Sequence, residues 1–211
     1  MRWDPRSVLT LAQLGRLEAY GALLLERNAR VNLIARTTAP ADVPVRHLAH
    51  SLTLARRGFP AGCTVVDFGT GGGLPGIPLA IAFPDVQFVL LDSTRKKVEA
   101  VADMARTLGL TNVTTHWGRA EDWDGQAHYA VSRATAPLRD LWRWFTRVRV
   151  LVEVGEAHWA PGLLALKGGD LTAEIRALPR RSAPDVETHD LFEMTGEAAF
   201  QDKVIVHVKP A

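Results

Sequence analysis

Residues 63–92 constrain the fold of this chain most, because they combine two apolar strand patterns with a glycine-rich loop. Residues 64–66 are a short β-branched run, typical of a strand that is buried on both faces. Four glycines follow between positions 69 and 73, and Pro75 suits the first turn of a helix. A second apolar run then ends at Asp92. The order of strand, loop, helix and strand predicts a β-α-β unit in a parallel sheet.

This unit predicts an adenosyl ligand above the carboxyl ends of the strands. Glycine allows positive φ and lets a ligand approach the main chain, and the first turn of the helix offers unpaired N–H groups. Asp92 can accept hydrogen bonds from a ribose diol, as acids do at this point of nucleotide-binding units. The alternative interpretation of the glycines is a tight turn in an ordinary α/β protein.

The residues around the glycines narrow the ligand class. Gly73 is followed by Leu74 and Pro75, whereas a P-loop needs Gly-Lys-Ser/Thr at this point. A dinucleotide site has GxGxxG, but the third glycine comes one residue early here. Asp67, just before the loop, would repel a pyrophosphate and suits a ligand that carries an ammonium or sulfonium. The pattern resembles the S-adenosylmethionine (SAM) site of class I methyltransferases.

Length and composition indicate one α/β domain with an N-terminal extension, since the chain has 211 residues and is 47% hydrophobic. Cys63 is the single cysteine, which fits a reducing compartment. The start lacks the apolar run of a signal peptide, and no apolar stretch is long enough to span a membrane. We therefore expect a cytoplasmic protein that makes no membrane contact.

Charge is unevenly distributed along the chain. Residues 1–57 hold nine arginines and four acids, for a net charge of +5, while the remainder carries −3. A basic extension on a more acidic body predicts contact with a polyanion, and a solvated helix face is the alternative.

The rest of the pattern predicts a mostly parallel sheet with helices on both faces and an antiparallel hairpin at the end of the chain. A surface turn is expected over 179–184. The expected helices cover 7–30, 42–57, 94–108, 137–148 and 170–178, and the expected strands beyond the first two cover 112–117, 129–132, 163–166, 187–192 and 203–208.

Several polar residues are candidates for the site. His47 and His50 share a helix face but have no third metal ligand at a suitable spacing, so polar contacts are expected and no metal. Arg133 ends a predicted strand, where it could hold a phosphate, a methionine carboxylate or a neighbouring acid. A row formed by Arg139, Arg143 and Arg147 is expected to be a solvated helix face.

Motifs along nearly the whole chain resemble the RsmG (GidB) family, the bacterial 16S ribosomal RNA guanine-N7 methyltransferases. The most specific is GTGGGLPGIPLA, at 69–80, together with Ser-Arg-Ala at 132–134 and Leu-Lys-Gly at 166–168. Further matches are Asn32-Leu33, Arg46-His47, Ser51, Val66-Asp67-Phe68, Leu91-Asp92-Ser93, Lys96-Lys97-Val98 and Gly118-Arg119-Ala120-Glu121.

The resemblance implies a class I SAM-dependent, Rossmann-like fold. A helical extension, 1–60, would pack on a SAM-binding domain, 61–211. The implied activity transfers a methyl group from SAM to N7 of a specific guanine in 16S rRNA and leaves S-adenosylhomocysteine. The implied partner is 16S rRNA or the small ribosomal subunit, no metal takes part, and a monomer is expected.

The resemblance also assigns site residues. Lys167 is the candidate near the RNA. The SAM site is implied for Gly69, Leu74, Asp92, Ala120, Glu121 and Arg133, with Asp67 and Gly71 beside them. Two departures affect RNA contact: His50 stands where the family usually has Asp, and Asp202-Lys203 stands where an Arg-His pair is usual.

Guanine N7 has an in-plane lone pair and carries no proton, so its methylation needs alignment and no general base. We therefore assign no acid–base residue. One alternative is an NAD(P)-dependent oxidoreductase with a Tyr-Lys relay, but neither Tyr20 nor Tyr129 has a lysine four residues on. A non-catalytic RNA-binding scaffold is the second alternative, and it would be marked by a broken glycine loop.

Overall fold

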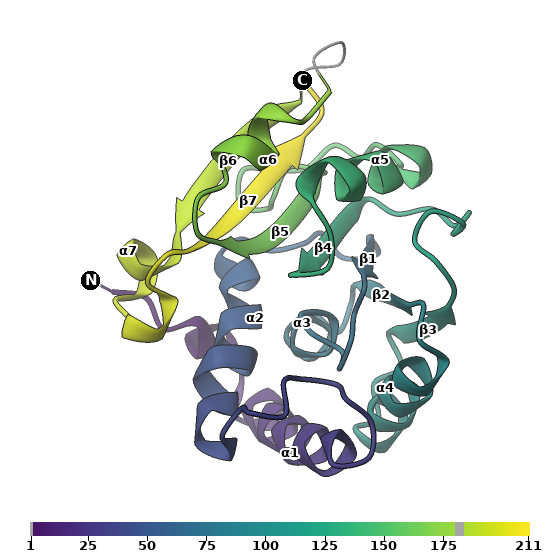
Figure 1. Ribbon diagram of the computed structural model, residues 1–211, viewed down its shortest axis with the longest axis vertical. Helices are drawn as coiled ribbons and strands as arrows, with labels where there is room; N and C mark the ends of the chain where they lie inside the picture. The colour runs from purple at the N-terminus through teal and green to yellow at the C-terminus, as the bar shows by residue number, and fades with distance from the viewer. Residues whose placement is uncertain (1, 180–183) are drawn as a thin grey trace.

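The computed structural model describes residues 2–179 and 184–211, and a seven-stranded sheet lies at its centre (Figure 1). The strand order is β3-β2-β1-β4-β5-β7-β6. The first five strands are parallel, and β7 runs antiparallel to both β5 and β6. This topology confirms the predicted α/β class. The strands are β1 (Thr64–Phe68), β2 (Gln87–Asp92), β3 (Val113–Trp117), β4 (Tyr129–Arg133), β5 (Leu163–Gly168), β6 (Asp185–Asp190) and β7 (Lys203–Lys209).

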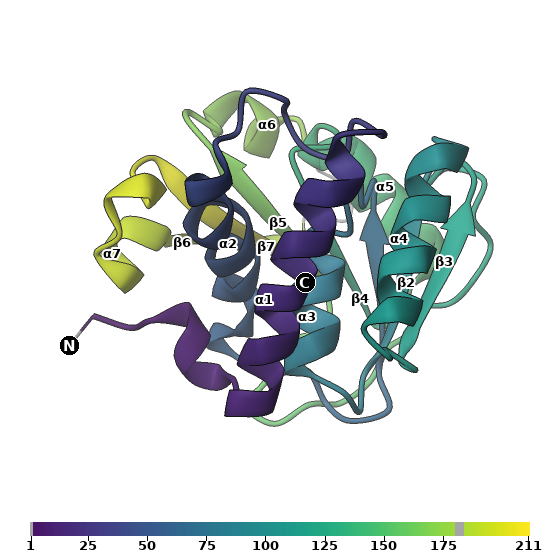
Figure 2. The same cartoon turned by 90° about the horizontal axis from the view of Figure 1, so that it is seen from below.

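Helices cover both faces of the sheet, as the sequence predicts (Figures 1 and 2). One face carries α1 (Leu11–Asn28), α3 (Gly76–Ala82) and α4 (Arg95–Thr107), and the other carries α5 (Leu138–Val148) and α6 (Thr172–Arg176). Short helical segments complete the chain: Pro5–Val8, Pro40–Asp42, Pro44–Ala49, α2 (His50–Leu52), Thr53–Arg56, α7 (Leu191–Thr195) and Ala198–Phe200.

The alternation of side chains along β1 divides the apolar core between the two faces. Val65 belongs to the cluster beneath α1, α3 and α4, whereas Val66 and Phe68 belong to the cluster beneath α5. All three are fully buried, and burial of such a side chain stabilises the fold by about 1.5–3 kcal/mol. Because both faces are covered, the strand shows the continuous apolar run that makes it recognisable in the sequence.

The N-terminal extension packs directly on this core. Thr10 and Gln13 form a capping box at the start of α1, so the predicted helix over 7–30 is wrong in its first turn, which is a separate 3₁₀ segment. The spacing of Val8, Leu11, Leu14, Leu17 and Leu24 predicts one apolar stripe along this helix. Leu17 and Leu24 are buried as this stripe predicts, but Leu11 is 88% exposed. The Gln13 side chain donates to the carbonyls of Ile81 and Ala82, which joins α1 to the last turn of α3.

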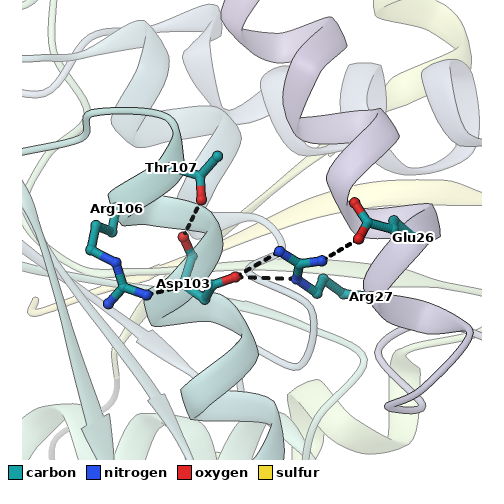
Figure 3. Close-up of polar contacts among 5 residues, drawn as sticks. All are labelled: Glu26, Arg27, Asp103, Arg106 and Thr107. Carbon is teal, nitrogen blue, oxygen red and sulfur yellow. Dashed lines mark hydrogen bonds and ion pairs between the residues drawn. The ribbon is translucent and has the colours of Figure 1, made fainter.

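An ion-pair group also joins α1 to α4 (Figure 3). Two nitrogens of Arg27 donate to one oxygen of Asp103, at 3.2 and 2.8 Å, and Arg27 also pairs with Glu26. Arg106 pairs with the other Asp103 oxygen at 2.5 Å. Arg27 therefore makes a structural contact between α1 and α4. Its position in the basic extension, taken alone, had also allowed a contact with a polyanion.

Two further predictions need correction. The expected helix over 42–57 is a series of 3₁₀, π and α turns, with the π-helix at Pro44–Ala49. The expected strand over 187–192 ends at Asp190, whose side chain accepts from the Glu193 N–H and starts α7. The two strands of the terminal hairpin are thus paired as predicted but joined by helical turns.

The region after β5 also differs from the prediction. The expected helix over 170–178 shortens to α6, where Asp170 accepts from the Thr172 N–H at 2.9 Å. The turn expected over 179–184 has its central residues, 180–183, outside the described part of the chain. No helix in the described residues has the length and apolarity to cross a lipid bilayer.

Candidate SAM-binding site

A cavity of about 680 Å³ opens above the carboxyl ends of β1, β2 and β4. Such a position at the carboxyl ends of parallel strands is where open α/β sheets bind ligands. Seven of the eight predicted cofactor residues line it: Gly69, Gly71, Leu74, Asp92, Ala120, Glu121 and Arg133. The structure therefore brings together residues from four separate parts of the chain.

The glycine loop forms the floor of the cavity, and two of the glycines that line it have positive φ. Gly69 has φ 71° and Gly71 has φ 58°, both in the left-handed region. A Cβ on Gly69 would lie 2.1 Å from Cγ2 of Thr135, whose hydroxyl donates to the Gly69 carbonyl at 3.2 Å. The close approach of Thr135 fixes the loop against the segment that follows β4.

Asp92 connects the end of β2 to this loop. One carboxylate oxygen accepts from the Gly71 N–H at 3.0 Å, and the other accepts from the Thr94 N–H at 2.8 Å. Each oxygen has two lone pairs, so capacity remains for a ligand in the cavity that both Asp92 and Gly71 line. The carboxylate is thus held in place by two main-chain hydrogen bonds.

Asp67 lies beneath the loop and does not line the cavity, unlike the other predicted cofactor residues. Its carboxylate is fully buried and accepts from the Thr70 hydroxyl at 2.7 Å and from the Gly76 N–H at 3.0 Å. Burial raises the pKa of Asp67 to about 7, although the bonds from Thr70 and Gly76 act in the opposite direction. The residue braces the loop against the first turn of α3.

The wall after β3 carries Ala120 and Glu121. The Glu121 carbonyl accepts from Arg147 of α5, and its carboxylate lies 3.7 Å from the Arg119 guanidinium. Lys97, from the first turns of α4, lines the same side of the cavity. Arg147, which belongs to the arginine row on α5, therefore supports the cavity wall through this hydrogen bond.

Arg133 ends β4 and lines the opposite side of the cavity. One of its terminal nitrogens lies 2.9 Å from Nδ1 of His47. Burial lowers the pKa of this guanidinium from its ordinary value, yet an arginine remains charged throughout the accessible pH range. In residues 2–179 and 184–211, no carboxylate forms an ion pair with Arg133.

Lys167 lies at the end of β5, outside the cavity lining, with a side chain only 10% exposed. Its ammonium donates to the Ala136 carbonyl at 2.7 Å and to Glu174 at 2.9 Å. The same Glu174 oxygen accepts from the Leu138 N–H at 2.9 Å. Lys167 thus supports the segment between β4 and α5, and its predicted proximity to RNA stays a prediction.

The cavity also contains residues that the sequence did not single out for it. Ser93 and Thr94 directly follow Asp92, so their position after a strand could have indicated them. Leu33 and Ala35 come from the extension, and Trp144 comes from α5. Leu33 belongs to the Asn32-Leu33 match, whereas Ala35 and Trp144 are placed by packing between distant segments, and no local signal marks them. The described residues contain no cluster of three metal-ligating side chains.

Comparison with known proteins assigns the chain to a family. The model of the family described as rRNA small subunit methyltransferase G (GidB) matches residues 13–199. The ribosomal RNA small subunit methyltransferase G of Salinibacter ruber is 51% identical over 99% of this chain and 98% of its own. The protein of the same name from Chlorobium luteolum is 43% identical over 92% of this chain and 81% of its own.

Solved structures show the same fold at low identity. A SAM-dependent methyltransferase from Aquifex aeolicus has a TM-score of 0.55 and 14% identity, covering 81% of this chain and 93% of its own. A ribosomal protein L11 methylase from Lactobacillus delbrueckii has a TM-score of 0.57 and 14% identity, covering 77% of each chain. Together with the family match, these similarities show that the chain is a member of the rRNA small subunit methyltransferase G (GidB) family with a class I, Rossmann-like methyltransferase fold.

Proposed function

We propose that this protein transfers a methyl group from SAM to N7 of a guanine in 16S rRNA and releases S-adenosylhomocysteine. The observation that carries the proposal is the Asp92–Gly71 hydrogen bond at the floor of a cavity in a chain of this family. Asp92 is held at the end of β2, where it can accept hydrogen bonds from both ribose hydroxyls.

The other lining residues fit the remaining parts of SAM. Ala120 and Glu121 form the wall on the Asp92 side, where the adenine would lie. Arg133 supplies a positive charge without an acidic partner in the described chain, which suits the methionine carboxylate. Gly71 leaves the main chain open to the ligand, since its Cβ position meets no protein atom closer than 3.6 Å, and Gly69 lines the cavity beside it. Asp67 braces the loop from below.

When bound, SAM supplies the reactive methyl group on its sulfonium. With SAM held by Asp92 and Arg133, its methyl group would pass to the N7 lone pair, and the electron pair of the broken carbon–sulfur bond would stay on sulfur. No proton moves in this step, so the site needs no general base. The contribution of the protein is to hold both partners in line, and Asp92, Glu121 and Arg133 line the cavity that would hold SAM.

The proposed partner is 16S rRNA or the small ribosomal subunit, and the protein would act as a cytoplasmic monomer. Of the arginines in the basic extension, Arg30 and Arg36 are exposed and flank the cavity-lining Leu33 and Ala35. We assign phosphate contacts to these two, since Arg27 is paired with Asp103.

Calorimetry with SAM, S-adenosylhomocysteine, NAD⁺ and NADP⁺ tests the ligand class. The proposal expects binding of the first two only. Preference for a dinucleotide would favour an oxidoreductase, and no binding of any of the four would favour an RNA-binding scaffold. Transfer of a labelled methyl group from SAM to small-subunit RNA then tests the activity.

A further inference from the structure

His47 lies against Arg133 although it comes from the N-terminal extension, 86 positions away in sequence. Nδ1 of His47 and Nη1 of Arg133 are 2.9 Å apart. A guanidinium has donors and no acceptor. The shared hydrogen therefore belongs to Arg133, and Nδ1 of His47 must offer its lone pair. This requirement selects the neutral imidazole that carries its proton on Nε2.

The surroundings of His47 favour the neutral form. Burial, together with the charges of Arg133 and Arg46, lowers the pKa of His47 to about 4, while Asp42 acts in the opposite direction. Nε2 of His47 is buried and has no hydrogen-bond partner within the described chain. That unpaired N–H is a cost of this tautomer. The hydrogen bond from Arg133 to Nδ1 offsets this cost and fixes the orientation of the ring.

The backbone around His47 is also unusual. The residue lies in the π-helix Pro44–Ala49, a wide turn that is rare in proteins and frequent at functional sites. The neighbouring Leu48 and Ala49 are buried, and the His47 carbonyl accepts from the Ser51 hydroxyl at 2.7 Å. The main chain at His47 is thus anchored, so the imidazole presents a fixed acceptor to Arg133.

We propose that His47 is a positioning residue, which holds Arg133 in the orientation that receives an anionic group of the ligand in the cavity. The inference rests on the proposed function for the identity of that ligand, the carboxylate of SAM. It gives the N-terminal extension a direct part in cofactor binding, because the extension supplies the acceptor that Arg133 lacks within the sheet. A single acceptor leaves the other guanidinium hydrogens available for the ligand.

Two variants separate positioning from packing. His47→Asn keeps an acceptor oxygen near the place of Nδ1, whereas His47→Leu keeps apolar volume and removes the acceptor. The affinity for SAM should fall about tenfold or more in the Leu variant, the lower end expected for removal of a hydrogen bond to a charged group. The Asn variant should restore most of it. KM for RNA and kcat at saturating SAM should change little in either variant.

Equal losses of SAM affinity in the Asn and Leu variants would overturn the proposal, because the acceptor would then be irrelevant. So would a normal SAM affinity in a folded Leu variant. Melting temperatures of both variants identify a loss that comes from unfolding. If the Leu variant does not fold, spectroscopy on the wild-type protein tests the proposal instead.

Long-range ¹H–¹⁵N spectra of ligand-free protein provide that second measurement, and they are independent of any activity. The His47 signals are assigned by their absence in the Asn variant. The proposal expects Nδ1 without a proton at neutral pH, and a shift of its resonance in Arg133→Met. A proton on Nδ1, or no response to Arg133→Met, would contradict it. Absence of SAM binding by wild type would instead overturn the proposed function alone.

Discussion

Asp92 accepts a hydrogen bond from the N–H of Gly71 at 3.0 Å, so the end of one strand is tied to the loop that follows its neighbour. The two residues are 21 positions apart in sequence and meet because β1 and β2 are parallel neighbours. A ligand that binds Asp92 must therefore lie over the glycine loop. This geometry links the affinity for SAM to both residues.

Asp92→Ala removes both the acceptor for the ribose hydroxyls and the acceptor of the hydrogen bond from the Gly71 N–H. SAM affinity should fall by about 1.5–3 kcal/mol, the range for hydrogen bonds to a charged group. Calorimetry measures this loss, with Asp124→Ala as the control, since Asp124 is exposed and lies outside the cavity lining. An unchanged affinity in folded Asp92→Ala would remove Asp92 from the site.

Gly71→Val places a branched side chain on the floor of the cavity. A Cβ at Gly71 meets no protein atom closer than 3.6 Å, so the substitution blocks the ligand without a severe internal clash. We expect SAM binding to be abolished. Gly62→Val is the matched control, because Gly62 also has positive φ, 78°, and has open space around its Cβ position. Both variants carry similar backbone strain, and normal SAM binding by Gly71→Val would show that the ligand lies elsewhere.

The basic extension gives a prediction about salt. Replacing Arg30 and Arg36 with Gln should reduce the slope of log RNA affinity against log salt by about 0.7 for each phosphate that the protein no longer neutralises. Arg27→Gln should leave that slope unchanged and lower the melting temperature, because Arg27 joins α1 to Asp103 of α4. Identical slopes for wild type and the double variant would place the RNA surface elsewhere, first on the exposed arginine row of α5.

Stability should decrease as the pH falls from about 6.5 to 4.5, because unfolding lets buried histidines take up protons. Burial lowers the pKa of His47 to about 4, of His50 to about 3 and of His207 to about 4. Asp67, with a pKa raised to about 7, has the opposite effect because its native state binds a proton first. The effect of the three histidines outweighs that of the one aspartate, so the free energy of unfolding decreases as the pH falls.

Substitution of one histidine tests the sign of this effect. His207→Gln should reduce the pH dependence of the free energy of unfolding by about 1.4 kcal/mol per pH unit within that window. Urea unfolding at several pH values measures it, with the exposed His116→Gln as the control. A slope that stays the same in His207→Gln would show that His207 titrates alike in the folded and unfolded chain.

Residues 63–92 were predictable because their signals are local. The apolar run of β1, the glycines and Asp92 each follow from contacts that a central parallel strand must make. The functions of Asp67 and Lys167 depend on what lies opposite them in space. Asp67 faces Thr70 and Gly76, and Lys167 faces Ala136 and Glu174. Residue type and position at a strand end do not reveal such partners.

The N-terminal extension was only partly predictable, because some of its contacts are with residues far away in sequence. Its apolar stripe predicts that Leu17 and Leu24 are buried, but Thr10 restarts the helix and leaves Leu11 exposed. His47 was expected to make a polar contact beside the site, and the structure supplies its partner, Arg133. The sequence predicts an ordinary helix where the structure has the π-helical turn that carries His47, next to the buried Leu48 and Ala49.

Methyl transfer to guanine N7 in small-subunit RNA is the activity on which the other proposals depend. It is measured most directly by mapping N7-methylguanine, through its specific chemical cleavage, in 16S rRNA from cells with and without this protein. We predict one N7-methylguanine that disappears in the deletion strain, returns with the wild-type protein and does not return with Asp92→Ala. An unchanged set of N7-methylguanines in the deletion strain would contradict this activity.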